Sequence, residues 1–137
     1  MEKLTLDTGV QSFRINGGGV LRFNPADPNV YARFMTATEK IKAMEQQISQ
    51  CADDPLAAMC KADREVKAQL GMVFGMDNDF DALLGGVNLL AVATNGERVI
   101  TNLLQALQPI LTAGARRCAG EQVAAAKEKA QRRRETQ

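Results

Sequence analysis

Apolar residues recur at helical spacing over most of this chain, but near the N-terminus they form two short runs instead. Residues 12–23 hold these runs on either side of Asn16-Gly17-Gly18-Gly19. Glycine adopts positive φ without steric cost, so this spacing predicts a β-hairpin with a short loop. An isolated hairpin is only marginally stable in water. We therefore expect its apolar side to pack on the helix that follows.

The first predicted helix covers about residues 28–49. Asp27 can cap its free amides, and Pro28 suits the first helical position. Its apolar residues are spaced alternately four and three apart: Val30, Phe34, Ala37, Ile41, Met44 and Ile48. Such a heptad stripe is commonly one face of a helix packed in its own domain. The alternative is a coiled-coil-like seam between two copies of the chain.

Three further helices are predicted at about residues 55–74, 79–94 and 97–113. The third contains Gly85-Gly86 and ends at Asn95-Gly96, and Pro109 should kink the fourth. The predicted fold is α+β and mostly α: a small N-terminal hairpin packed on a bundle of about four helices, with a basic C-terminal helix or tail. One domain, residues 1–114, accounts for the hairpin and the bundle.

A basic, partly ordered tail is expected at residues 115–137. This segment carries 7 Lys/Arg against 3 Asp/Glu, whereas residues 1–114 carry 10 against 13. It is rich in helix-forming residues but offers almost nothing to bury, which predicts a helix only when docked. The tail could contact an acidic partner or nucleic acid, or it could be a solvated, frayed terminus. The candidate contact residues are Arg116, Arg117, Arg132, Arg133 and Arg134.

The composition argues against catalysis. The chain has no His, so it offers neither a Ser-His-Asp triad nor a Cys-His pair, and its serines lack an SxxK pattern. Gly17-Gly18-Gly19 lacks the Lys-Ser/Thr ending of a phosphate loop and leads into a strand. We expect no catalytic residues, no enzyme activity and no cofactor.

Metal binding is also not expected. The three cysteines, Cys51, Cys60 and Cys118, have neither CxxC spacing nor a histidine to complete a zinc site. Cys51 and Cys60 flank a predicted turn and could bridge, although a reducing cytoplasm favours free thiols.

The acidic cluster after the second predicted helix matches a calcium-binding loop only in part. Asp77, Asp79 and Asp81 match the first three ligand positions of an EF-hand. Ala82 stands where that loop needs glycine, and Asn88 stands where it needs glutamate. Acidic residues at a helix start explain the cluster better.

The N-terminus lacks the apolar stretch of a signal peptide, and no apolar run approaches the ~20 residues that a membrane span needs. We expect a cytoplasmic location and no membrane contact. The basic tail contains no aromatic residue for base stacking, so nucleic acid is not the expected partner.

Four features follow one another along the chain: the hairpin end Val20-Leu21-Arg22-Phe23-Asn24-Pro25, the helix from Tyr31-Ala32-Arg33-Phe34, the turn Val73-Phe74-Gly75 with acidic residues after it, and Asn95-Gly96 before residues 99–110. In this order they resemble the tail assembly chaperones of long-tailed bacteriophages, especially those that infect Gram-positive hosts. The resemblance covers roughly residues 12–113.

The resemblance implies a non-enzymatic assembly factor of the bacterial host cytoplasm, absent from the mature virion. Such proteins coat the tape measure protein and keep it soluble until the tail tube polymerises. In the family, a frameshifted longer form often recruits the tail tube protein. A homo-oligomer is also expected.

The methionines are the candidate partner-binding residues, because their flexible side chains repack easily against varied partners. Filling the core of an aromatic-poor domain is the alternative role for each of them. Two other functions stay open: a structural virion component at the head-tail junction, and a small regulatory protein that contacts nucleic acid through its basic tail. The methionines concerned are Met35, Met44, Met59, Met72 and Met76.

Overall fold

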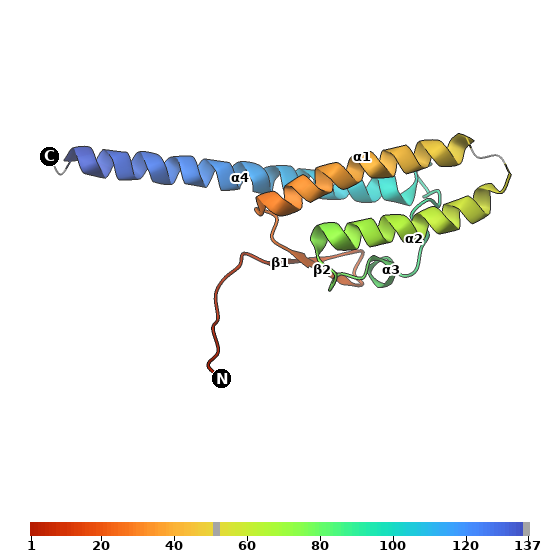
Figure 1. Ribbon diagram of the computed structural model, residues 1–137, viewed down its shortest axis with the longest axis horizontal. Helices are drawn as coiled ribbons and strands as arrows, with labels where there is room; N and C mark the ends of the chain where they lie inside the picture. The colour runs from red at the N-terminus through yellow and green to blue at the C-terminus, as the bar shows by residue number, and fades with distance from the viewer. Residues whose placement is uncertain (51–52, 136–137) are drawn as a thin grey trace.

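The computed structural model describes the backbone of residues 1–50 and 53–135, and the side chains of residues 1–50 and 53–120. An antiparallel two-stranded hairpin precedes a set of helices, which confirms the α+β, mostly α prediction (Figure 1). The described residues form β1 (Gln11–Arg14), β2 (Val20–Phe23), α1 (Pro28–Gln50), α2 (Pro55–Phe74), α3 (Phe80–Leu83) and α4 (Val99–Glu135).

The hairpin forms where the glycine spacing predicts it. Asn16 and Gly17 adopt φ of 51° and 75°, and the Ile15 amide donates to the Gly19 carbonyl at 2.9 Å. The aromatic contact of β2 is made with α2 instead of the helix that follows: the rings of Phe23 and Phe74 lie 4.7 Å apart between centroids. The apolar side of the hairpin thus packs on the C-terminal end of α2.

The heptad stripe of α1 belongs to the core of its own domain. Five of its six residues are buried and Met44 is half-buried, and α1 runs beside α2 and α4 (Figure 1). The structure therefore agrees with the first interpretation of the stripe, as one face of a helix packed in its own domain. The alternative, a seam between two copies, would need apolar surface that is already covered within one chain.

The predicted helix over residues 79–94 is wrong beyond its first turn. Only Phe80–Leu83 is helical. Gly85 and Gly86 adopt φ of 65° and 77°, a left-handed backbone that a right-handed helix cannot continue through. Asp79 does cap this turn, since its side chain accepts from the amides of Asp81 and Ala82, as expected of an acidic helix start.

The predicted helix 97–113 and the basic tail are one continuous helix. α4 covers 37 residues and continues through Pro109 to Glu135. Figure 1 shows its N-terminal part beside α1 and its C-terminal part projecting beyond the rest of the molecule. Of the predicted helix or tail at the C-terminus, the backbone is therefore the helix, because the helix-forming residues there extend a helix that already exists.

Gly114 marks the point where α4 passes the chain between the hairpin and α1. A β-carbon at this position would lie 1.8 Å from the carbonyl oxygen of Pro25. Both residues are buried. Only glycine allows α4 to approach the Pro25 backbone this closely.

Across the residues that the structure describes, none of the helices combines the length and apolarity that crossing a membrane requires.

Candidate protein-binding surface

The five candidate methionines divide into exposed and half-buried ones. Met35, Met72 and Met76 expose 41%, 64% and 79% of their surface. Met44 and Met59 are partly buried and pack against the core. Exposed methionines can adapt to a partner, whereas the half-buried pair also serves to fill the domain interior.

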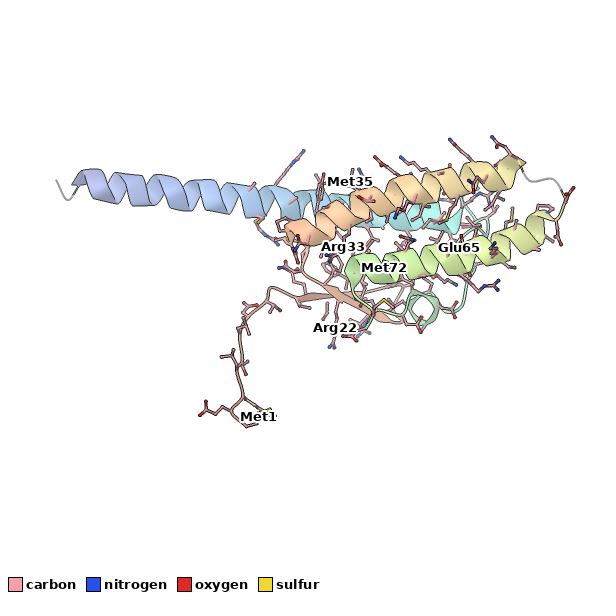
Figure 2. The ribbon with its side chains drawn as sticks, in the orientation of Figure 1. Met1, Arg22, Arg33, Met35, Glu65 and Met72 are labelled. Atoms are coloured by element: carbon pink, nitrogen blue, oxygen red, sulfur yellow. The ribbon has the colours of Figure 1, made fainter. Side chains whose placement is uncertain are left out.

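Met72 borders a cavity between α1 and α2. The cavity has a volume of about 270 Å³. Figure 2 shows Arg33 and Met72 facing the space between the two helices, with Met35 on the other side of α1. The lining residues recur every three or four positions on each helix: Ala32, Arg33, Thr36, Ala37 and Lys40 from α1, and Gln69, Met72 and Val73 from α2.

Arg33 is fixed at the mouth of this cavity. Its Nε and Nη2 atoms both donate to the carbonyl oxygen of Val73 at 3.1 Å. This carbonyl lies in the last turn of α2, where helix carbonyls lack partners and the dipole favours a positive charge. The site therefore places the positive charge of Arg33, fixed by these hydrogen bonds, beside the flexible apolar side chain of Met72.

Met44 borders a second cavity, nearer the other ends of α1 and α2. Its volume is about 220 Å³. The lining residues again come from both helices: Met44, Gln47 and Ile48 from α1, and Ala58, Lys61, Ala62 and Glu65 from α2. Figure 2 shows Glu65 on the same side of α2 as Met72.

A larger hollow of about 690 Å³ lies beside the hairpin, between β2, the start of α1 and the end of α2. Asn78, which is buried, shapes one wall of it. Its side chain accepts from the Arg22 amide at 2.9 Å and donates to the Arg22 and Phe74 carbonyls at 2.8 Å and 3.0 Å. Asn78 thus satisfies the free edge of β2 and ties the hairpin to α2.

Lys67 holds the segment after α3 against α2. Its Nζ donates to Asp63 at 3.0 Å, to Asp81 at 2.6 Å and to the Val87 carbonyl at 2.8 Å. Burial of the ammonium group works to lower its pKa, but the hydrogen bonds and charges of Asp81 and Asp63 raise the pKa above its ordinary value. All of these partners are internal, which indicates a structural role.

The candidate arginines lie on a different part of the molecule. Arg116 and Arg117 are exposed on α4 just beyond Gly114, whereas the methionines belong to α1, α2 and the turn after α2. Arg132, Arg133 and Arg134 fall within the helical backbone of α4, but their side chains lie outside the described ones. The ten candidate residues thus come from different elements, the arginines from α4 and the methionines from α1, α2 and the turn after α2.

Within the part of the chain that the structure describes, no three His, Cys, Asp or Glu side chains gather where they could hold a metal ion. Cys60 is exposed and Cys118 is half-buried. Cys51 lies outside the described residues, and so does any pairing of Cys51 with Cys60.

Sequence reasoning selected Met72 and Met44 but missed the charged residues beside them. Arg33, Lys40 and Lys61 have no motif of their own, and only the pairing of α1 with α2 brings them to the two cavities. The surface offers apolar hollows and fixed charges, which suit binding of another chain. Comparisons with protein-family models, with curated proteins and with solved structures find no match to this chain.

Proposed function

We propose that this chain is a non-enzymatic tail assembly chaperone of a long-tailed bacteriophage, which binds the tape measure protein and keeps it soluble during tail assembly. The observation that carries the proposal is the cavity between α1 and α2 with the exposed Met72 at its edge. An amphipathic helix lays its apolar face into a groove of this kind. The resemblance over residues 12–113 supplies the identity of the helical partner.

The methionines suit a client that presents many similar but not identical segments. Met72 and Met76 are largely exposed, and a thioether side chain repacks against different apolar shapes with little loss. A chaperone that coats a long helix needs this tolerance more than it needs one exact fit.

The proposed chaperone has a cellular location, a second protein partner and an oligomeric state. The chaperone acts in the bacterial host cytoplasm, where the client is made, and is absent from the mature virion. The tail tube protein is a second partner, and a homo-oligomer provides several binding surfaces along one client. Since the α1 stripe is buried, self-association would have to use another face.

The projecting half of α4 favours one alternative, a small regulatory protein that contacts nucleic acid. From residue 115 on the chain is basic, and the helix carries that charge away from the body (Figure 1). Binding of this kind would weaken steeply with salt. The other alternative, a structural virion component at the head-tail junction, would be retained in purified particles.

The test is co-expression of the chain with the long helical protein encoded just downstream of it. We expect the two to co-purify in moderate salt and the larger protein to stay soluble. Met72→Lys should reduce capture at least about fivefold, because a charge at the cavity edge opposes apolar docking. Leu56→Lys is the matched control. Leu56 is an exposed apolar residue in the first turn of α2 and does not line the cavity. A client that is soluble alone and ignores this chain would refute the proposal.

A further inference from the structure

The two cavities between α1 and α2 lie along one face of the helix pair. On α1 their outer lining residues are Arg33, Thr36, Lys40, Met44 and Gln47, and on α2 they are Ala58, Lys61, Glu65, Gln69 and Met72. Each set advances by three or four residues, which keeps it on one side of its helix. We call this face the α1–α2 groove.

The floor of the α1–α2 groove is apolar. Ala37, Ile48, Ala62 and Val73 line it and are all buried. Met44 and Met72 border it as the flexible side chains. Such a floor receives apolar side chains from a partner and excludes water around them.

The sides of the groove are basic. Three basic residues line the groove, Arg33, Lys40 and Lys61, and one acidic residue, Glu65. This contrasts with residues 1–114 as a whole, which carry 10 Lys/Arg against 13 Asp/Glu. In the described part of the chain both ion pairs belong to Lys67, so neither uses a groove residue. Three positive charges against one negative charge therefore line this face, and a partner in the groove would meet a net positive charge.

We infer that the α1–α2 groove binds an amphipathic helix whose apolar stripe is flanked by aspartate and glutamate. Acidic flanks complement the basic sides and would orient the helix in the groove. The inference deepens the proposed function by naming the kind of segment that is bound, and it rests on that function for the identity of the partner.

The spacing of the cavities defines the segment further. Thr36 of α1 and Met72 of α2 line the first cavity. Gln47 of α1 and Lys61 of α2 line the second. Along either helix the two cavities are separated by about eleven residues, or about 16 Å at the rise of an α-helix. The bound helix should present two large apolar side chains about eleven residues apart, three turns along the same face.

The charge of the groove argues against α4 of a second copy as the occupant. The projecting part of α4 carries the excess of basic residues, and like charges facing each other across an interface are unfavourable. An acidic helix of another protein is the occupant that the charges favour.

The experiment uses two synthetic helical peptides of about 25 residues, the length that spans α1. Both carry the same apolar stripe with leucines about eleven residues apart, and one is flanked by glutamates, the other by lysines. Fluorescence anisotropy measures their binding to the full chain. We expect the glutamate peptide to bind at least about tenfold more tightly, and Lys40→Glu with Lys61→Glu to reverse this preference.

The matched control is Lys42→Glu with Arg64→Glu. These two exposed residues lie on the same helices, change the net charge equally and line neither cavity. The control should keep the wild-type preference. Equal binding of both peptides, or equal effects of the two double variants, would overturn the inference. So would dimerisation of the chain that Lys40→Glu with Lys61→Glu abolishes, since the occupant would then be a second copy.

The same variants separate this inference from the proposed function. If the downstream helical protein co-purifies with wild type and both double variants equally, the groove inference fails and the function stands. If the glutamate peptide shows the expected preference but the helical protein is never captured, the function fails and the groove inference stands.

Discussion

α2 and the segment after α3, residues 84–98, share a hydrophobic pattern but differ in backbone. Both place apolar residues at helical spacing, and both bury leucine completely: Leu70 and Leu89 each expose 0% of their surface. Yet α2 is helical from Pro55 to Phe74, whereas the other segment is built from turns and the Val92–Arg98 bridge. Burial alone therefore does not decide that a segment is helical.

The difference lies in where each backbone finds its hydrogen bonds. α2 begins with an Asp54 cap and a proline in its first turn, and it satisfies its amides internally. The segment after α3 cannot form the helical hydrogen bonds throughout, because Gly85 and Gly86 take left-handed φ, and turn hydrogen bonds satisfy only part of its backbone. Two side chains of α2 supply the missing partners: Asp63 accepts from the Leu89 amide at 2.8 Å and Lys67 donates to the Val87 carbonyl.

The largest effect should come from truncating a buried leucine in either region. We expect Leu70→Ala and Leu89→Ala each to lower the free energy of unfolding by about 3 kcal/mol, because both leave a cavity among buried neighbours. Urea denaturation followed by circular dichroism measures this. A much smaller loss for Leu89→Ala would mean that the turns relax around the cavity. The two regions would then not be equally well packed.

A smaller effect is expected for Asp63→Ala. It removes the acceptor of the Leu89 amide and one partner of Lys67, whose side chain is 9% exposed. We expect a loss of about 2 kcal/mol and faster hydrogen exchange at Leu89, with α2 retained.

Asp77→Ala, at an exposed acidic residue in the turn after α2, is the control for that measurement. It should change stability by less than about 0.5 kcal/mol. Equal losses of unfolding free energy for the two variants would contradict a stabilising role for the hydrogen bond between Asp63 and the Leu89 amide.

Gly85→Ala should cost about 1 kcal/mol. A β-carbon there meets nothing within 4 Å, but the φ of 65° strains any residue except glycine. Gly120→Ala on α4 also meets open space and has no positive φ, so it should be neutral or stabilising. Thermal unfolding of the two variants compares them. A stabilising Gly85→Ala would mean that the segment can adopt the helix that its pattern predicts.

The smallest effect concerns pH. The pKa of Lys67 lies above its ordinary value of 10.5 in the folded chain. The stabilisation from this shift is complete below that value and is lost as pH rises through the raised pKa. We expect the unfolding free energy to fall more steeply above about pH 10 for wild type than for Lys67→Met. Parallel pH profiles would show that Lys67 makes no ionic contribution.

Much of the fold could be predicted from local pattern. The Asn16–Gly19 spacing predicted the hairpin, and the cap residues and apolar spacing predicted α1 and α2 within a few residues. The predicted helix over residues 79–94 failed because Gly85 and Gly86 take left-handed φ, and the turns that replace it are held in part by a long-range contact. Asp63 is 26 residues from the Leu89 amide that it holds, and no local pattern reports such a bond.

The candidate surface was predictable only in part. The composition pointed to the methionines as a group, and of these Met72 does border a cavity, whereas Met59 packs against the core. The basic side chains beside it were not predictable, because Lys40 and Lys61 are charged positions on two amphipathic helices like many others. Their shared face exists only because α1 and α2 pack antiparallel (Figure 1).

By itself, the sequence determined the elements whose causes are local: glycine positive φ in the hairpin, proline and aspartate at helix starts, and apolar periodicity along α1 and α2. The tertiary structure alone decided that Asp63 of α2 holds the Leu89 amide, that Gly114 admits the Pro25 backbone and that basic residues line one groove. Each of these depends on groups far apart in sequence, which packing brings within contact distance.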